Sequence, residues 1–156
     1  MSLPGFRDAR RTVAEASYFV ATGGTGPPIL LLHGFPETHV CWMRIAPQLA
    51  EAHQVVVPDL RGYGASEAAP GGPRGEGYSK REMAGELVEL MVASGHERFA
   101  VVGHDRGGRV AYRLALDHPD RVTRVAILNI VPTLEQFERM GAGSEVLVDF
   151  LRTDAR

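Results

Sequence analysis

The chain has 156 residues, a formal net charge of −2 and a pI near 6.3, so it lacks the basic surface expected of a protein that binds nucleic acid or an anionic membrane. There is no apolar run of transmembrane length or signal-peptide type, and the single cysteine, Cys41, excludes an internal disulfide. We therefore expect a cytoplasmic chain with one hydrophobic core and no nucleic-acid or membrane partner, since 44% of its residues are hydrophobic.

The first third of the chain predicts two short strands or a hairpin, a turn, a buried strand and a helix. Residues 11–22 are rich in β-branched and aromatic side chains, which favour strands. The glycine-rich segment 23–28 has no following Gly-Lys-Ser/Thr and precedes a strand, so it predicts a turn and not a phosphate loop. Residues 29–32 are continuously apolar, as in a strand buried on both faces. Residues 38–51 carry apolar side chains at helical spacing, with a kink or a late start at Pro47.

The middle of the chain continues with a strand, a loop and a helix. Residues 54–58 form the next buried strand, and the Pro/Gly-rich segment 67–77 predicts a flexible loop. Ser79 and Glu82 have the spacing of a capping box, which predicts that a helix starts there and ends near Gly95.

The last strands and helices complete an alternating pattern. Residues 99–102 and 122–131 read as buried strands, and a helix between them ends near His118. The apolar face of that helix, turned to the sheet, is predicted to contain Val110, Leu114 and Ala115. Strands that alternate with helices predict an α/β fold with a doubly wound, mainly parallel sheet.

Residues 101–109 lead from a strand through a glycine-rich turn into a helix, with the pattern G-x-D-x-G. This is the nucleophile elbow G-x-S-x-G with Asp105 in place of serine. A carboxylate at a helix N-terminus is favoured by the unpaired amides and the helix dipole, so Asp105 could attack without help from a base. The alternative is an ordinary capped helix start, because aspartate is a common N-cap and glycine a common turn residue.

Arg106 and Arg109 lie three residues apart on the helix that follows. Residues at this spacing occupy neighbouring positions on one turn, so the two guanidinium groups could hold a small carboxylate beside Asp105. The alternative is a pair of solvated or salt-bridged helix residues.

Four segments carry a resemblance to a known family: H-G-F-P at 33–36, D-L-R-G-Y-G-A-S at 59–66, G-H-D-R-G-G-R at 103–109 and L-D-H-P-D-R-V at 116–122. In this order and spacing, over about residues 10–134, the chain resembles the α/β-hydrolases. An arginine after the aspartate resembles the haloacetate (fluoroacetate) dehalogenases, whereas haloalkane dehalogenases and many epoxide hydrolases usually have tryptophan there. The runs H-G-F-P-E-T-H-V-x-W and L-N-I-V-P-T also look like that subgroup.

The resemblance implies a reaction and a set of roles. Asp105 would displace halide from a small haloacid, giving an aspartyl ester that water hydrolyses to a hydroxy acid. The backbone amides of Phe35 and Arg106 would form the oxyanion hole, and Arg106 and Arg109 would bind the substrate carboxylate. Neither a cofactor nor a metal is implied.

The chain departs from the subgroup in three respects. Asn129 occupies the position of the acid that orients the catalytic histidine, none of the six histidines lies at the position of the general base, and the residues after Pro132 and Thr133 do not match the lid. The chain therefore resembles an N-terminal half, with part of the core domain over 1–134 and the start of a lid or a divergent helical tail over 135–156.

This reading leaves strand 122–131 at a sheet edge, which favours a homo-oligomer or a complementing chain as partner. Two alternatives to the dehalogenase stay open. One is an epoxide hydrolase that uses the same aspartate. The other is a non-catalytic remnant that binds carboxylates or serves as an interaction module.

Overall fold

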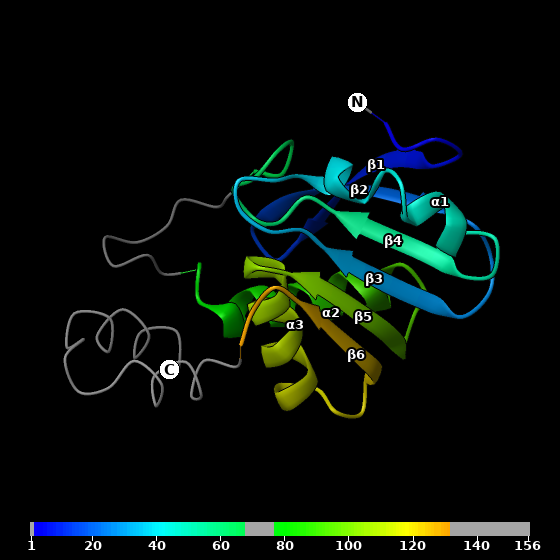
Figure 1. Ribbon diagram of the computed structural model, residues 1–156. Coiled ribbons are helices and arrows are strands. Elements are labelled where there is room, and N and C mark those ends of the chain that lie inside the picture. The colour runs from blue at the N-terminus through cyan, green and yellow to red at the C-terminus, as the bar shows by residue number, and fades with distance from the viewer. Residues whose placement is uncertain (1, 68–76, 132–156) are drawn as a thin grey trace.

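The computed structural model describes residues 2–67 and 77–131, which form one six-stranded sheet in the order β1-β2-β4-β3-β5-β6 (Figure 1). The strands are β1 (Arg7–Val13), β2 (Ala16–Gly23), β3 (Pro28–Leu32), β4 (Gln54–Pro58), β5 (Phe99–His104) and β6 (Val122–Leu128). The β1–β2 hairpin joins the sheet antiparallel to β4, and β4, β3, β5 and β6 are parallel to one another. The mainly parallel sheet predicted from the sequence is confirmed.

Helices cover both faces of the sheet, as expected for a doubly wound fold. Helices α2 (Lys80–Ala93) and α3 (Arg106–Asp117) pack on one face, while η1 (His39–Trp42) and α1 (Ala46–Leu49) lie on the other (Figure 1). The predicted capping box starts α2: Ser79 Oγ accepts the Glu82 N–H at 3.1 Å, and the Glu82 carboxylate accepts the Ser79 N–H at 3.3 Å.

Some predicted details differ from the structure. The helix predicted over 38–51 is split into η1 and α1, but the predicted late start is confirmed: α1 begins at Ala46, and Pro47, which has no N–H, occupies its first turn. The hairpin begins at Arg7, earlier than the predicted range. In α3 the predicted Val110 and Leu114 are buried in the core, but the third buried apolar side chain is that of Ala111, and the predicted Ala115 is only half-buried.

Strand β6 ends at Leu128 and not at 131, because Asn129 has a φ of 60° and turns the chain. The tail predicted over 135–156 and most of the loop predicted over 67–77 lie outside the described residues.

The core has two layers, one on each side of the sheet. The larger layer lies between the sheet and α2 and α3, and it contains fully buried side chains such as Tyr18, Leu32, Leu87 and Leu114. The smaller layer, on the other face, is centred on Leu31 and Trp42 and is closed by η1 and α1. These two layers fix the positions of the strand ends from which the candidate site is built.

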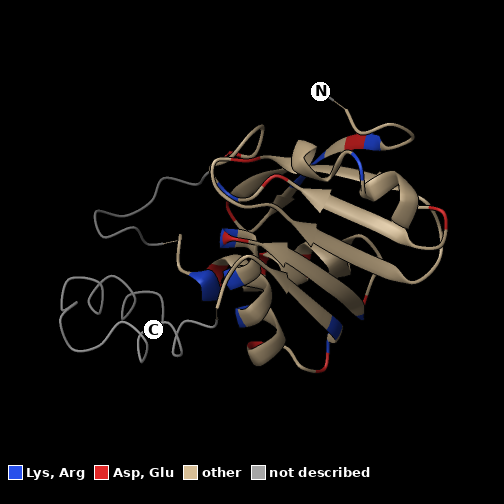
Figure 2. Ribbon diagram, viewed as in Figure 1, with Lys and Arg blue, Asp and Glu red and all other residues tan. Residues whose placement is uncertain are grey.

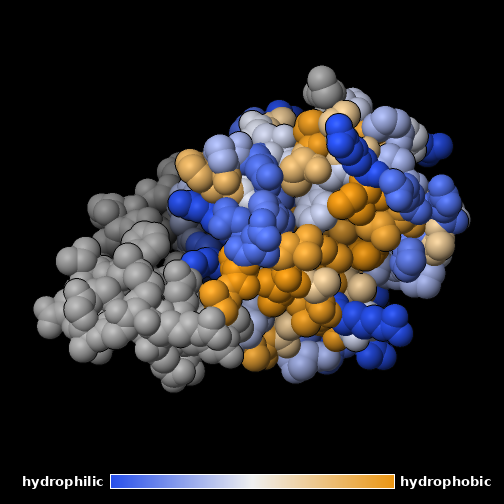
Figure 3. Space-filling view, in the orientation of Figure 1, coloured by the Kyte–Doolittle hydropathy of each residue, from blue (hydrophilic) through white to orange (hydrophobic). Residues whose placement is uncertain are grey.

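The second face is less well covered over β5 and β6. Ala100 and Val102 of β5 are half-buried at the margin of the smaller layer. Their register partners in β6, Arg124 and Ala126, point to the same face and are exposed. Figure 3 shows hydrophobic side chains gathered over the middle of this face. Within the described residues, β6 is an edge strand, as the sequence predicts.

Charged side chains of both signs are interspersed around the ends of the strands and helices (Figure 2). Over residues 2–67 and 77–131, no helix is both long and apolar enough to cross a bilayer.

Candidate active site

Asp105 stands at a sharp turn between β5 and α3. Its backbone has φ 46° and ψ −114°, a strained conformation for a residue other than glycine. The Asp105 N–H donates to the Leu128 carbonyl at 3.0 Å, and the Asp105 carbonyl accepts the Arg109 N–H at 3.1 Å. The Asp105 side chain makes no capping hydrogen bond to α3. The turn therefore has the geometry of a nucleophile elbow and not that of an ordinary aspartate N-cap.

Two glycines make this turn possible. A Cβ atom added to Gly103 would lie well within 3.0 Å of the Gly107 carbonyl, and one added to Gly107 would lie equally close to the carbonyls of Leu32 and His33. Helix α3 thus approaches β3 and β5 backbone to backbone, which brings Asp105 next to the loop that follows β3.

The loop after β3 supplies a hydrogen-bond donor to Asp105. The Phe35 N–H donates to Asp105 Oδ2 at 2.9 Å. Gly34 lies just as close, because a Cβ added there would be 2.7 Å from Asp105 Cβ. The second predicted oxyanion donor, the Arg106 N–H, belongs to the first residue of α3. With Oδ2 held by Phe35, Oδ1 is the oxygen available to attack an electrophile.

Two aromatic residues hold the exposed side chain of Arg106 in place. Its Nη1 donates to the Tyr63 hydroxyl at 3.0 Å, and its guanidinium carbon lies 4.9 Å from the centre of the Phe35 ring. Phe35 is 57% exposed and Arg106 is exposed too, so this cation faces solvent. Arg109 is half-buried, one turn further along α3. Tyr63 is not among the predicted site residues, although it lies in the motif D-L-R-G-Y-G-A-S.

Asn129, at the predicted acid position, contacts His104 and not a distant histidine. Asn129 Nδ2 lies 3.2 Å from His104 Nε2, and His104 Nδ1 lies 2.9 Å from Glu37 Oε2. The same Glu37 oxygen accepts the Gly34 N–H at 2.9 Å. Glu37 is not among the predicted site residues, although it lies in the run H-G-F-P-E-T-H-V-x-W.

The surroundings favour a charged Glu37 and a protonated Cys41. Desolvation raises the pKa of Glu37, but hydrogen bonds from Gly34 and His104 oppose it and leave that pKa below its ordinary value. Desolvation and the neighbouring Glu37 raise the pKa of the Cys41 thiol to about 12. Cys41 is therefore a poor nucleophile near neutral pH.

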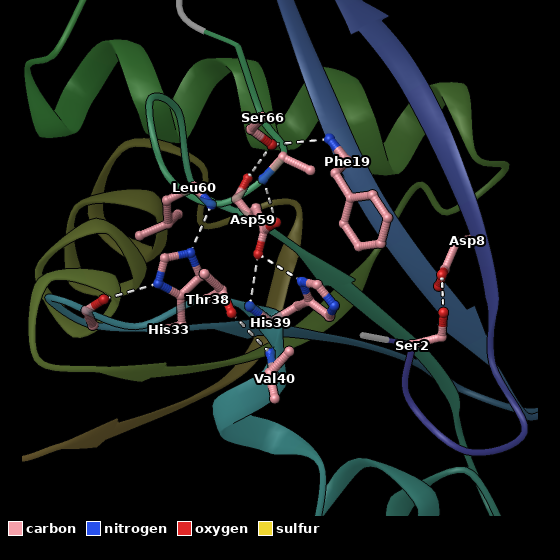
Figure 4. Close-up of polar contacts among 12 residues, drawn as sticks. Ser2, Asp8, Phe19, His33, Thr38, His39, Val40, Asp59, Leu60 and Ser66 are labelled. Carbon is pink, nitrogen blue, oxygen red and sulfur yellow. Dashed lines mark hydrogen bonds and ion pairs between the residues drawn. The ribbon is translucent and has the colours of Figure 1, made fainter.

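Buried polar residues anchor the loop 59–66, which carries Tyr63 (Figure 4). Asp59 accepts the backbone N–H groups of His39 at 2.7 Å and Ala65 at 2.9 Å, and it pairs with His39 Nδ1 at 2.7 Å. The Ser66 hydroxyl donates to the Asp59 carbonyl at 2.7 Å and accepts the Phe19 N–H at 2.9 Å.

His33 joins the same loop to the strand that precedes Phe35. His33 Nε2 accepts the Leu60 N–H at 2.8 Å, and Nδ1 donates to the Gly34 carbonyl at 2.8 Å. The side chain is fully buried, and desolvation lowers its pKa. His33 is therefore a neutral structural residue with both ring nitrogens in use.

We expect stability to fall as the pH is lowered through and below about 6.5, the pKa of an unfolded histidine. The unfolded chain binds a proton at His33 there, while the folded chain, whose His33 pKa is lower, does not; acid therefore favours unfolding. The measurement is urea unfolding between pH 5 and 8. The variant His33→Gln should show a weaker pH dependence. His96, whose pKa burial also lowers, contributes equally to both proteins. An unchanged slope in the variant would contradict the assignment.

Among the described residues, no group of three or more His, Cys, Asp or Glu side chains could hold a metal ion. The chemistry that the described site offers is that of a carboxylate with one oxygen held by a backbone amide, an adjacent guanidinium and a nearby imidazole.

Comparison with known proteins relates the chain to one family. The family model for the alpha/beta hydrolase fold matches residues 27–154. A fluoroacetate dehalogenase from Burkholderia sp is 48% identical over 136 residues, which are 87% of this chain and 45% of that protein. A soluble epoxide hydrolase from Corynebacterium sp. (strain C12) is 42% identical over 113 residues, which are 72% of this chain and 38% of that protein.

Solved structures agree with the sequence comparison. An α/β hydrolase from Nostoc sp PCC 7120 superimposes with a TM-score of 0.83 at 46% identity, covering 94% of this chain and 50% of that one. The chain thus spans about half the length of that structure, and less than half that of the two curated relatives.

Proposed function

Because the chain belongs to the α/β-hydrolase family, we propose that Asp105 is the nucleophile of a hydrolase that removes halide from a small haloacid such as a haloacetate. The observation that carries this proposal is the hydrogen bond from the Phe35 N–H to Asp105 Oδ2, which holds that oxygen while Oδ1 accepts no hydrogen bond from the residues that the structure describes. Oδ1 attacks the carbon that bears the halogen, a carbon–oxygen bond forms, and the halide leaves with the electrons of the broken bond. Water then hydrolyses the aspartyl ester, which restores the Asp105 carboxylate and releases a hydroxy acid and a proton.

Arg106 and Arg109 are proposed to bind the carboxylate of the haloacid. The Arg106 guanidinium is held by Phe35 and Tyr63, so a substrate carboxylate would bind to a cation whose position is fixed. A carboxylate held there presents its α-carbon to Asp105, and this positioning replaces a random encounter in solution.

An epoxide hydrolase is the second candidate, supported by the 42% identity to the Corynebacterium enzyme. The same Asp105 oxygen would open an epoxide, but an epoxide has no carboxylate for Arg106 to bind. Reaction with chloroacetate and not with a simple neutral epoxide would favour the haloacid. A non-catalytic module that only binds carboxylates is the remaining proposal.

The first test is covalent labelling of the full chain with excess chloroacetate, followed by peptide mass mapping. We expect a carboxymethyl ester on Asp105, or glycolate in solution if the ester turns over. The control variant Asp105→Asn should give neither. Cys41 is mapped in the same spectra, since a thiol can be alkylated without an active site. Labelling confined to Cys41, with no glycolate released and no chloride beyond the one that each alkylated thiol displaces, would exclude the proposed nucleophile and favour the non-catalytic module.

Chloroacetamide, the neutral analogue of chloroacetate, tests the role of the arginines. If Arg106 binds the substrate carboxylate, Arg106→Leu should slow the reaction of Asp105 with chloroacetate about tenfold or more, because a charge-assisted hydrogen bond contributes about 1.5 to 3 kcal/mol. The reaction with chloroacetamide should change little. Equal losses with both reagents would show that Arg106 supports the fold of the site and does not bind the carboxylate.

A further inference from the structure

The ends of three neighbouring strands are joined by a chain of hydrogen bonds beside Asp105. Glu37 and Gly34 follow β3, His104 ends β5, and Asn129 follows β6. Glu37 Oε2 contacts both the Gly34 N–H and His104 Nδ1 at 2.9 Å, and His104 Nε2 contacts Asn129 Nδ2 at 3.2 Å. The side chains of Glu37 and His104 are 32% and 26% exposed, whereas Asn129 is exposed at the end of the series.

The partners of His104 decide where its proton lies. A carboxylate only accepts hydrogen bonds, so the contact with Glu37 requires a proton on Nδ1. An amide nitrogen only donates, so the contact with Asn129 Nδ2 requires a lone pair on Nε2. Together the two contacts select the neutral imidazole with its proton on Nδ1. An aspartate at position 129 could not do this, because it would demand a proton on Nε2 as well.

Glu37 in turn fixes the peptide that faces Asp105. It accepts the Gly34 N–H through its side chain, and its own N–H donates to the Gly34 carbonyl at 3.1 Å. The next N–H along the chain, that of Phe35, is the one that donates to Asp105 Oδ2. Rotation of the Gly34–Phe35 segment would break the bonds to Glu37 and the bond to Asp105 together.

We propose that Glu37 is a positioning residue for the Phe35 oxyanion donor, and that Asn129 supports it by holding His104 with its proton on Nδ1. The inference rests on the proposed function for its effect on reactivity, but its structural part stands on the hydrogen bonds alone. An amide at position 129 thus has a role that an acid there would not have, because it donates to the unprotonated Nε2 of the imidazole that bonds to Glu37. The inference therefore assigns two residues, Glu37 and Asn129, that act on Asp105 through the backbone of the loop after β3.

The first readout is NMR of the full chain. Two-bond ¹H–¹⁵N spectra of His104 should show a protonated Nδ1 and an unprotonated Nε2. In Asn129→Asp, Nε2 should become protonated. In Glu37→Ala, the Phe35 amide proton should exchange with solvent faster. Its chemical shift should also lose the downfield displacement that its hydrogen bond to Asp105 causes. Glu51→Ala, which removes an exposed glutamate after α1, is the matched control and should change neither signal. A Phe35 amide that is unaffected in Glu37→Ala would overturn the proposal.

The second readout is the rate of Asp105 alkylation. Glu37→Ala should slow the reaction with chloroacetate and with chloroacetamide alike, by about tenfold to a hundredfold, since a misplacement of about 1 Å can cost on the order of a hundredfold. Glu37→Gln should recover most of the rate, because its amide oxygen can still accept both hydrogen bonds.

The two readouts separate the two proposals. If the protein without substitutions is not alkylated at Asp105, the proposed function fails. The NMR signals of the Phe35 amide and the His104 ring still test the positioning role in that case. If Glu37→Ala alkylates at the parental rate, or if Glu37→Gln is as slow as Glu37→Ala with its fold intact, the positioning role fails even where the proposed function holds.

Discussion

Gly107→Ala is expected to lower the free energy of unfolding by about 3 kcal/mol or more, while Gly85→Ala raises it by about 0.5 to 1 kcal/mol. Both glycines lie inside helices, where alanine is ordinarily the better residue. A Cβ at Gly107, however, would lie within 3.0 Å of the carbonyls of Leu32 and His33, and neither backbone can move away cheaply. A Cβ at Gly85 meets no atom within 4 Å.

Urea unfolding followed by circular dichroism measures both free energies, and the pair provides its own control because the chemical change is identical. Gly107→Ala should also displace Asp105, so the loss of stability should be accompanied by loss of Asp105 alkylation in the fraction that remains folded. Effects of the same sign at both positions would show that backbone contact between α3 and β3 does not limit this fold.

Arg61→Met is expected to lower the free energy of unfolding by about 3 to 5 kcal/mol, because it leaves the buried Glu86 carboxylate without its cation. Arg61 Nη1 donates to Glu86 Oε1 and to the Gly77 carbonyl, both at 2.7 Å, and the Tyr18 hydroxyl donates to Glu86 Oε2 at 2.5 Å. The side chains of Arg61 and Glu86 are only 7% and 11% exposed. Burial raises the pKa of Glu86, against the opposing contributions of Tyr18 and Arg61.

A second ion pair on α2 provides the matched control for Arg61→Met. Arg81 pairs with Asp117 at 3.1 Å, but its side chain is 50% exposed, so Arg81→Met should change stability by no more than about 0.5 kcal/mol. The double variant Arg61→Met with Glu86→Leu should recover part of the loss by removing the stranded charge. If Arg61→Met proves as mild as Arg81→Met, the carboxylate of Glu86 is neutral or hydrated in the folded protein.

The sequence predicted the parts of this fold that depend on local patterns. Continuous apolar runs identified the buried strands β3, β4 and β5, and the pair Ser79 and Glu82 marked the start of α2, because burial and capping leave their signature in adjacent residues. The hairpin was predicted too late and the helix over 38–51 too long. In the latter segment the apolar spacing was helical, but the missing N–H of Pro47 decided the outcome.

The candidate site was predictable only where one motif contains it. Asp105 and the elbow glycines lie within seven residues, so their relation could be read directly from the sequence. Glu37, His104 and Asn129 come from three strands, and nothing in their local sequences links them; parallel pairing brings their strand ends together. Tyr63 reaches Arg106 in the same way, from the loop after β4. The roles assigned to Asp105, Phe35, Arg106, Arg109 and Asn129 stay predictions until the labelling experiments are done.

The position of β3 in the sheet has a consequence for how the chain folds. β3 pairs with β4 on one side and β5 on the other, and both partners come later in the sequence. During synthesis β3 therefore has no partner until β4 and then β5 have been made. Pairing with β5 closes a long loop, and the entropy of loop closure makes this step slow. Asp105 follows β5 directly, so its carboxylate can reach the Phe35 N–H only after β5 has paired with β3. The backbone bond from Asp105 to Leu128 requires β6 in addition.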